Sequence, residues 1–131
     1  LLTMHEISLC YSLLDTVAVH QRANMNKSVS LVHVKVGPLS GVEPDLLHHA
    51  FLACRTHTIG HQATLRIDTS AIKIRCKLCG EFSRVSVNSI LCASCGAWQT
   101  DLIEGDEFIL QRIEFIAPDN FTESKERKHV R

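Results

Sequence analysis

The chain has 131 residues, of which 45% are hydrophobic, so it is large enough for one compact domain with a core and a small appended module. Its 14 basic and 14 acidic side chains cancel, whereas a nucleic-acid-binding protein usually carries a basic surplus. No apolar stretch is long enough for a membrane span, and the first residues, which include Glu6, lack the basic segment of a secretory signal, so we expect neither.

The first half of the chain predicts two helices and two strands. Residues 7–22 carry apolar side chains at helical spacing, and a second helix is expected to begin at Pro44 and end at Ile59-Gly60. Residues 29–36 and 63–67 alternate as strands do. The side chains expected on the buried helix faces are Ile7, Cys10, Tyr11, Leu14, Val17 and Ala18 in the first helix, and Leu47, Ala50, Phe51 and Cys54 in the second.

A third strand is predicted over residues 106–115, with the two earlier strands as its partners. Ile72 and Ile74 continue an extended path into a cysteine-rich segment, and Trp98 is expected to cover the apolar face of that segment. The fold class is therefore predicted as α+β, with a small mixed sheet of about three strands, two helices and an inserted zinc-ribbon-like lobe with four cysteines.

Two Cys-x-x-Cys-Gly segments predict the zinc site. They are Cys76-Lys77-Leu78-Cys79-Gly80 and Cys92-Ala93-Ser94-Cys95-Gly96. Two residues between the thiolates let one tight turn direct both sulfurs at the same ion, and the glycine can take a positive φ. Four thiolates favour Zn²⁺ in a closed, tetrahedral, structural site over two redox dithiols or two disulfides. Cys10 and Cys54 are expected to be buried thiols, which suits a reducing cytoplasm.

Met4-His5-Glu6 is the second candidate metal site, and its spacing alone is a weak signal. An imidazole beside backbone amides can bind a late divalent ion through nitrogens in a planar arrangement. Ni²⁺ and Cu²⁺ prefer that geometry. A histidine near the start of a chain is more often simply exposed, so the residues by themselves leave this site open.

Taken together, these motifs resemble the HypA/HybF family of hydrogenase nickel-incorporation proteins. The resemblance extends from Met4 to about Phe115 with the motifs in the same order. The segments that carry it are Met4-His5-Glu6-Ile7-Ser8-Leu9, Val36-Gly37-Pro38-Leu39-Ser40-Gly41-Val42-Glu43-Pro44, residues 47–51, the two Cys-x-x-Cys-Gly segments, and Gly105-Asp106-Glu107.

The resemblance implies a cytoplasmic metallochaperone that carries Ni(II) transiently for the maturation of [NiFe]-hydrogenase, or in some members of urease. It implies a nickel site formed by the His5 side chain and backbone nitrogens around Met4, His5 and Glu6, with Glu6 contacting a partner or orienting a ligand. It implies a structural Zn(II) whose ligands are Cys76, Cys79, Cys92 and Cys95. The implied partners are the nickel-handling GTPase HypB and the hydrogenase large subunit, and a homo-oligomer stays open.

One departure from the family concerns the residues before Met4. The family has its initiator methionine at this position, whereas Leu1-Leu2-Thr3 precede it here. If these residues are native, the nitrogen of Met4 is an amide, and a nickel site that uses the terminal amine is impossible. A site built on the His5 ring and backbone amides would survive in altered form.

The predicted domain organisation places the zinc lobe within an α/β domain. Residues 1–75 and 105–117 are expected to form the nickel-binding domain and residues 76–104 the zinc-binding lobe, with residues 118–131 as a disordered tail.

The alternative function is a zinc-ribbon module that binds nucleic acid or a macromolecular assembly. Lys73, Arg75, Lys77 and Arg84 form a modest basic cluster that would serve it, although a solvated face with counter-charges such as Glu81 explains the cluster more simply. An enzyme is not expected, because the sequence has no Ser-His-Asp, His-Glu-x-x-His or glycine-rich phosphate motif and a four-cysteine zinc site has no open position for water.

Overall fold

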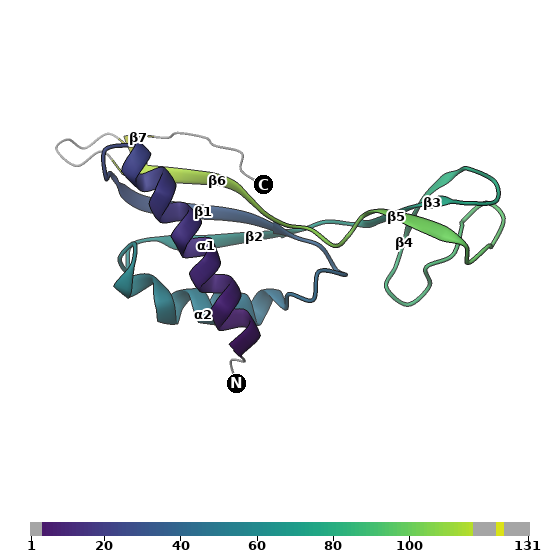
Figure 1. Cartoon of the computed structure of the whole chain (residues 1–131), viewed down its shortest axis with the longest axis horizontal. Helices are drawn as coiled ribbons and strands as arrows, with labels where there is room; N and C mark the ends of the chain where they lie inside the picture. The colour runs from purple at the N-terminus through teal and green to yellow at the C-terminus, as the bar shows by residue number, and fades with distance from the viewer. Residues whose placement is uncertain (1–3, 117–122, 125–131) are drawn as a thin grey trace. The chain divides into compact units, whose positions relative to one another are not determined.

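The computed structural model describes residues 4–116 and 123–124, which fold as two compact units (Figure 1). The helical unit contains the described residues of 1–34, 43–67 and 109–131, and the cysteine unit contains residues 35–42 and 68–108. Within this described part of the chain, no helix combines the length and the apolar character that a membrane span requires.

The helical unit contains both helices and a sheet with strand order β2-β1-β6-β7. Figure 1 shows β2, β1 and β6 side by side in this sheet. The elements are α1 (Met4–Ala23), β1 (Ser28–Val36), α2 (Pro44–Cys54), a short 3₁₀ helix η1 (Arg55–His57), β2 (Thr64–Thr69), β6 (Phe108–Ile116) and the two-residue β7 (Glu123–Ser124).

The two helices pack against each other through the faces that the apolar spacing predicts. Cys10, Leu14 and Val17 of α1 are buried, and so are all four residues expected on the inner face of α2. Tyr11 differs from the prediction, because its side chain is 43% exposed. The second helix also ends earlier than expected, at Cys54, and η1 follows it before Gly60 at φ +89°.

Strand pairing in the helical unit agrees with the predicted sheet in part, because β6 pairs with β1 as expected but has β7, and not β2, as its other neighbour. β6 lies next to β1, and β2 lies on the other side of β1. Val32 and Val34 of β1 are fully buried, as are Ile113 and Phe115 of β6, so these two strands contribute side chains to the hydrophobic core. The α+β fold class with two helices is confirmed. Most of the segment 118–131, predicted to be a disordered tail, lies outside the described residues.

The cysteine unit has a sheet of its own, which the sequence did not predict. It consists of β3 (Ile72–Cys76), β4 (Phe82–Val85) and β5 (Thr100–Glu104), in the order β4-β3-β5 with both pairs antiparallel. Ile72 and Ile74 are buried on one face of β3. The extended path expected at these two residues is therefore the central strand of a second sheet.

A close backbone approach joins two of the motif segments within the cysteine unit. The Gly37 amide donates a hydrogen bond to the Glu107 carbonyl oxygen at 2.8 Å, and the Leu39 amide donates one to the Gly105 carbonyl oxygen at 2.6 Å. A Cβ atom on Gly37 would collide with the Gly105 carbonyl. The glycine at position 37 is therefore required by the space between the two segments and not by a positive φ.

Candidate metal centre

The two Cys-x-x-Cys-Gly segments fold into matching turns. In the first turn the Gly80 amide donates a hydrogen bond to the Cys76 carbonyl oxygen at 3.0 Å, and in the second the Gly96 amide donates one to the Cys92 carbonyl oxygen at 2.9 Å. The two glycines have φ values of +79° and +78°, as the sequence predicts. A residue with a Cβ atom is strained at such a φ even though open space surrounds both positions.

Backbone hydrogen bonds hold the turns on the sheet and on each other. The Cys76 amide donates to the Glu81 carbonyl oxygen at 2.9 Å, and the Lys77 amide donates to the Gln99 carbonyl oxygen at the same distance. Because residue 99 lies just beyond the second turn, this last bond connects the two turns directly. The paired strands β3, β4 and β5 and these backbone bonds thus position both turns through contacts of the protein alone.

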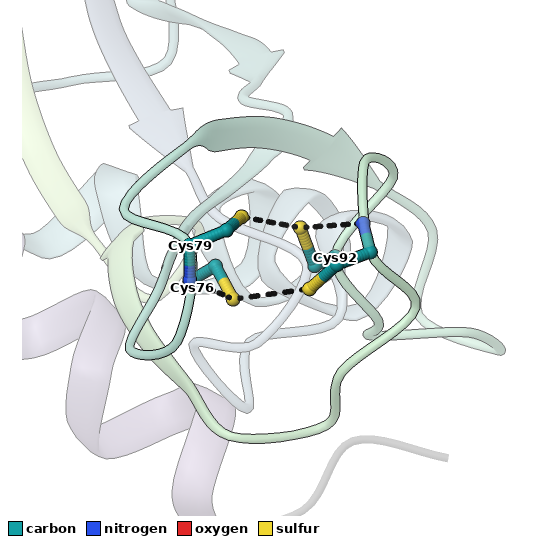
Figure 2. A group of neighbouring side chains, drawn as sticks. Cys76, Cys79 and Cys92 are labelled. Atoms are coloured by element: carbon teal, nitrogen blue, oxygen red, sulfur yellow. Dashed lines mark hydrogen bonds between the residues drawn. The ribbon is translucent and has the colours of Figure 1, made fainter.

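The four cysteine sulfurs converge on one point. All four lie within 4.8 Å of one another, and the sulfur pairs Cys76–Cys95 and Cys79–Cys92 are each 3.6 Å apart. Figure 2 shows Cys76 and Cys79 on one loop facing Cys92 on the other. A disulfide would need about 2.05 Å between sulfurs. Tetrahedral ligands at the usual Zn–S distance of about 2.3 Å are about 3.8 Å apart, close to the separations found here.

Amide groups of the turns point at two of these sulfurs. The Leu78 and Cys79 amides donate hydrogen bonds to the sulfur of Cys76, at 3.3 and 3.4 Å, and the Cys95 amide donates one to the sulfur of Cys92 at 3.4 Å. The bond from Cys95 lowers the pKa of Cys92 to about 6, and the bond from Cys79 lowers the pKa of Cys76. Thiolates, the form that binds metal, are therefore favoured at Cys76 and Cys92, whereas burial and contacts with the neighbouring cysteines raise the pKa of Cys79 and of Cys95.

Ser83 supports the cysteine cluster and was missed by sequence reasoning. Its hydroxyl oxygen, on β4, accepts a hydrogen bond from the Ala93 amide at 3.0 Å, and the residue is buried. The bond ties the strand after the first turn to the backbone between Cys92 and Cys95. A serine among strand residues gives no signal in the sequence, because only the fold brings it to the second turn.

The expectation for Trp98 was wrong. Its side chain is 73% exposed and does not cover an apolar face. The backbone on both sides is held, since the Ala97 carbonyl oxygen accepts from the Cys92 amide and the Gln99 carbonyl oxygen accepts from the Lys77 amide.

The N-terminal candidate site lies at the start of α1 in the helical unit. Met4, His5 and Glu6 form the first turn of this helix, where backbone amides have no intrahelical acceptor. The His5 side chain is exposed, whereas Glu6 is buried. Among residues 4–116 and 123–124, the cysteine cluster is the one group of three or more potential metal ligands, so the structure does not bring His5 together with two or more further side-chain ligands of this kind.

Cys10 and Cys54 are buried free thiols, as expected. Burial and the neighbouring Cys54 thiol raise the pKa of Cys10 to about 12. A thiol with such a pKa is almost entirely protonated at neutral pH and is a poor metal ligand or nucleophile. These two residues belong to the helix packing and not to a metal centre.

The chain matches a protein-family model described as "Hydrogenase/urease nickel incorporation, metallochaperone, hypA" over residues 4–115. Among its relatives, the hydrogenase maturation factor HypA of Aquifex aeolicus is 39% identical over 111 residues, covering 85% of this chain and 96% of the relative. The hydrogenase maturation factor HypA of Wolinella succinogenes is 37% identical over 117 residues, covering 88% of this chain and 98% of the relative.

Solved structures show the same fold. The solution structure of the Ni metallochaperone HypA from Helicobacter pylori has a TM-score of 0.64 at 23% identity, covering 86% of this chain and 98% of that one. A second solution structure, of a HypA protein, has a TM-score of 0.67 at 24% identity, covering 88% and 99%. With the family match over residues 4–115 and relatives above 30% identity, the chain belongs to the HypA family of hydrogenase/urease nickel-incorporation metallochaperones.

Proposed function

We propose that this chain carries Ni(II) as cargo to a maturing nickel enzyme and catalyses no reaction of its own. The observation that carries the proposal is the family match over residues 4–115, which includes the Met4-His5-Glu6 segment. The exposed His5 ring at the first turn of α1 supports it, because an ion bound there can both arrive and leave through solvent. We assign the nickel site to His5 with backbone nitrogens around Met4, His5 and Glu6.

A backbone-nitrogen site has a structural consequence at the start of α1. Helical amides point along the helix axis in one direction, whereas planar coordination by nitrogen requires successive amide nitrogens to converge on one ion. Residues 4–6 are helical in this structure. Nickel binding in the proposed form therefore requires the first turn to unwind, and rewinding of the turn would favour release of the ion.

We assign a structural Zn(II) to Cys76, Cys79, Cys92 and Cys95. The donor set fits this ion, because four converging sulfurs, with two sulfur pairs 3.6 Å apart, suit tetrahedral coordination. Within the described residues, the group holds these four ligands and no fifth. When bound, the ion supplies cross-linking of the two turns and no reactive water. The cysteine unit would then serve as the zinc-binding lobe and the helical unit as the nickel-binding domain. The cysteine unit, with residues 35–42 and 68–108, is larger than the expected lobe of residues 76–104, and it takes residues from the expected domain of 1–75 with 105–117.

The partners follow from the family resemblance. We propose the [NiFe]-hydrogenase large subunit as the recipient of nickel and the GTPase HypB as the working partner, with delivery in the cytoplasm. Urease is the second candidate recipient, because the description of the matched family includes urease. The alternative of a nucleic-acid-binding zinc ribbon is not favoured, since the family match spans residues 4–115 and the formal net charge is +0.

A nickel titration of the zinc-loaded protein tests the proposed site. We expect His5→Ala to abolish the tight nickel-binding step in calorimetry, while His61→Ala, which removes another exposed histidine of the helical unit, leaves the step unchanged. Equal nickel binding by wild type and His5→Ala would remove His5 from the site. A variant that begins at Met4 distinguishes the ligand sets, because only a site that uses the terminal amine would gain affinity.

A further inference from the structure

One face of the β4-β3-β5 sheet carries cations around an exposed aromatic ring. In the antiparallel register Arg75 of β3 lies opposite Phe82 of β4, and Lys73 lies opposite Arg84. Residues directly opposite each other share one face of a sheet, and so do residues two apart on a strand. These four side chains, termed here the cation–Phe82 face, therefore form one surface of the cysteine unit.

The Phe82 ring lies close to two of these cations and remains open to solvent. The Lys73 Nζ atom is 5.2 Å from the ring centroid, and the Arg75 Cζ atom is 5.8 Å from it. Both distances are within the range of cation–π attraction. The Phe82 side chain is nevertheless 57% exposed, so the ring is held in place by its neighbours and not covered by them.

The cations of this face are not engaged in ion pairs within the part of the chain that the structure describes. Lys77, next to the face, pairs with Asp101 at 3.5 Å, but Lys73, Arg75 and Arg84 form no ion pair with a described carboxylate. Lys73 and Arg84 also stand directly opposite each other, an arrangement of like charges that costs stability in a sheet. Carboxylates from another molecule would relieve this repulsion.

The neighbouring strand β5 limits which kind of anion can bind to the cation–Phe82 face. On β5, Asp101 lies opposite Arg75 and Glu104 lies opposite Lys73, so the same face is bordered by negative charge. The basic strip is therefore only the width of β3 and β4, about 5 Å between strands. A nucleic-acid strand carries a phosphate at every nucleotide and gains affinity from a wide basic surface, whereas a short peptide can place a few carboxylates on a narrow strip.

We propose that the cation–Phe82 face docks a short acidic segment of a partner protein, whose carboxylates pair with Arg75, Arg84 and Lys73 and whose adjoining apolar side chain covers Phe82. Arginine favours this partner because its guanidinium can bind a carboxylate through two parallel hydrogen bonds. This surface lies in the cysteine unit and its role does not depend on nickel binding, so it adds to the proposed function.

The zinc-loaded full chain and a defined probe test the proposal. The probe is a short acetylated and amidated peptide of Glu and Gly with one central Leu, and the control peptide has Gln in place of Glu. We expect the acidic peptide to shift the amide NMR signals of β3 and β4 in a saturable way, and the control peptide to leave them unchanged. Added salt should weaken the binding, because the contacts are partly exposed ion pairs.

Matched variants locate the binding. Arg75→Gln with Arg84→Gln is expected to reduce affinity for the acidic peptide by about tenfold or more, and Arg84→Gln alone to give part of that loss. Arg22→Gln, which removes an exposed arginine of α1, should have no effect. Absence of saturable binding, or equal binding by the double variant, would overturn the proposal. Tighter binding of a single-stranded oligothymidylate than of the peptide would also overturn it and assign the face to nucleic acid.

Discussion

The Ser70 hydroxyl donates a hydrogen bond to the Glu107 carboxylate, with 2.6 Å between the two oxygens. The same carboxylate oxygen accepts a hydrogen bond from the Gly105 amide at 3.1 Å, and the Ser70 amide donates one to the Val36 carbonyl oxygen at 3.1 Å. Glu107 thus links three segments of the cysteine unit that are distant in sequence. The bond from Ser70, with further help from the Gly105 amide and Lys35, lowers the pKa of Glu107.

Glu107→Gln is expected to destabilise the protein by roughly 1 kcal/mol at neutral pH, because the charged acceptor of two hydrogen bonds is lost. The pKa of Glu107 is lower in the folded chain than the usual value of about 4.3 for the unfolded one, so its stabilising effect is complete above that pH. The effect is lost as the pH falls through the folded-state pKa. Urea unfolding of wild type and Glu107→Gln as a function of pH measures the difference in their free energies of unfolding. Titration of the cysteine thiols contributes equally to the two proteins and cancels in this difference.

The stability difference between wild type and Glu107→Gln should therefore shrink on acidification. Asp106→Asn, which removes an exposed neighbouring carboxylate, serves as the control and should show little difference at any pH. A gap between wild type and Glu107→Gln that stays constant into the acid range would show that the carboxylate charge contributes nothing.

Gly37→Ala is expected to destabilise the protein by about 1–3 kcal/mol, because the new methyl group would collide with the Gly105 carbonyl. Gly41→Ala is the matched comparison. Its Cβ would meet open space, and only the backbone strain at φ +79° would cost stability, about 1 kcal/mol. Urea unfolding midpoints of the two variants test whether Gly37→Ala loses more stability than Gly41→Ala. A smaller loss for Gly37→Ala than for Gly41→Ala would mean that the two motif segments separate readily.

Ser83→Ala is expected to weaken zinc binding by about tenfold, because the Ala93 amide beside Cys92 loses its acceptor. Competition with a chromophoric zinc chelator measures the change. Ser86→Ala, at an exposed position just after β4, removes a hydroxyl that forms no hydrogen bond with either cysteine turn and should leave zinc affinity unchanged. Identical affinities for the Ser83→Ala and Ser86→Ala proteins would show that this bond does not support the second turn.

Trp98→Ala is expected to change the free energy of unfolding by less than about 0.5 kcal/mol, as is usual for an exposed side chain. A tryptophan that covered the apolar face of the cysteine unit would cost about 3–5 kcal/mol on the same substitution. The chain has a single tryptophan, so acrylamide quenching of its fluorescence provides an independent measurement. Quenching should be close to that of N-acetyltryptophanamide, and strong protection from acrylamide would contradict the exposed position.

Local patterns in the sequence were sufficient for the inner face of α2 and for the cysteine turns. The inner face of α2, with Leu47, Ala50, Phe51 and Cys54, follows from helical spacing because residues three and four apart lie on one side of a helix. The positive φ of Gly80 and Gly96 follows in the same way from the tight turn that two cysteines at this spacing require. Both features depend on neighbours only a few residues away.

The tertiary structure decided what depends on contacts between distant segments. The pairing of β3 with β4 and β5 gave the cysteine unit its own sheet, and that sheet placed Lys73 opposite Arg84 and Arg75 opposite Phe82. Ser83 reached the second turn, and Trp98 remained exposed, for the same reason. Strand partners and burial depend on which segments meet after the chain closes, whereas the spacing of four cysteines needs only the geometry of two short turns.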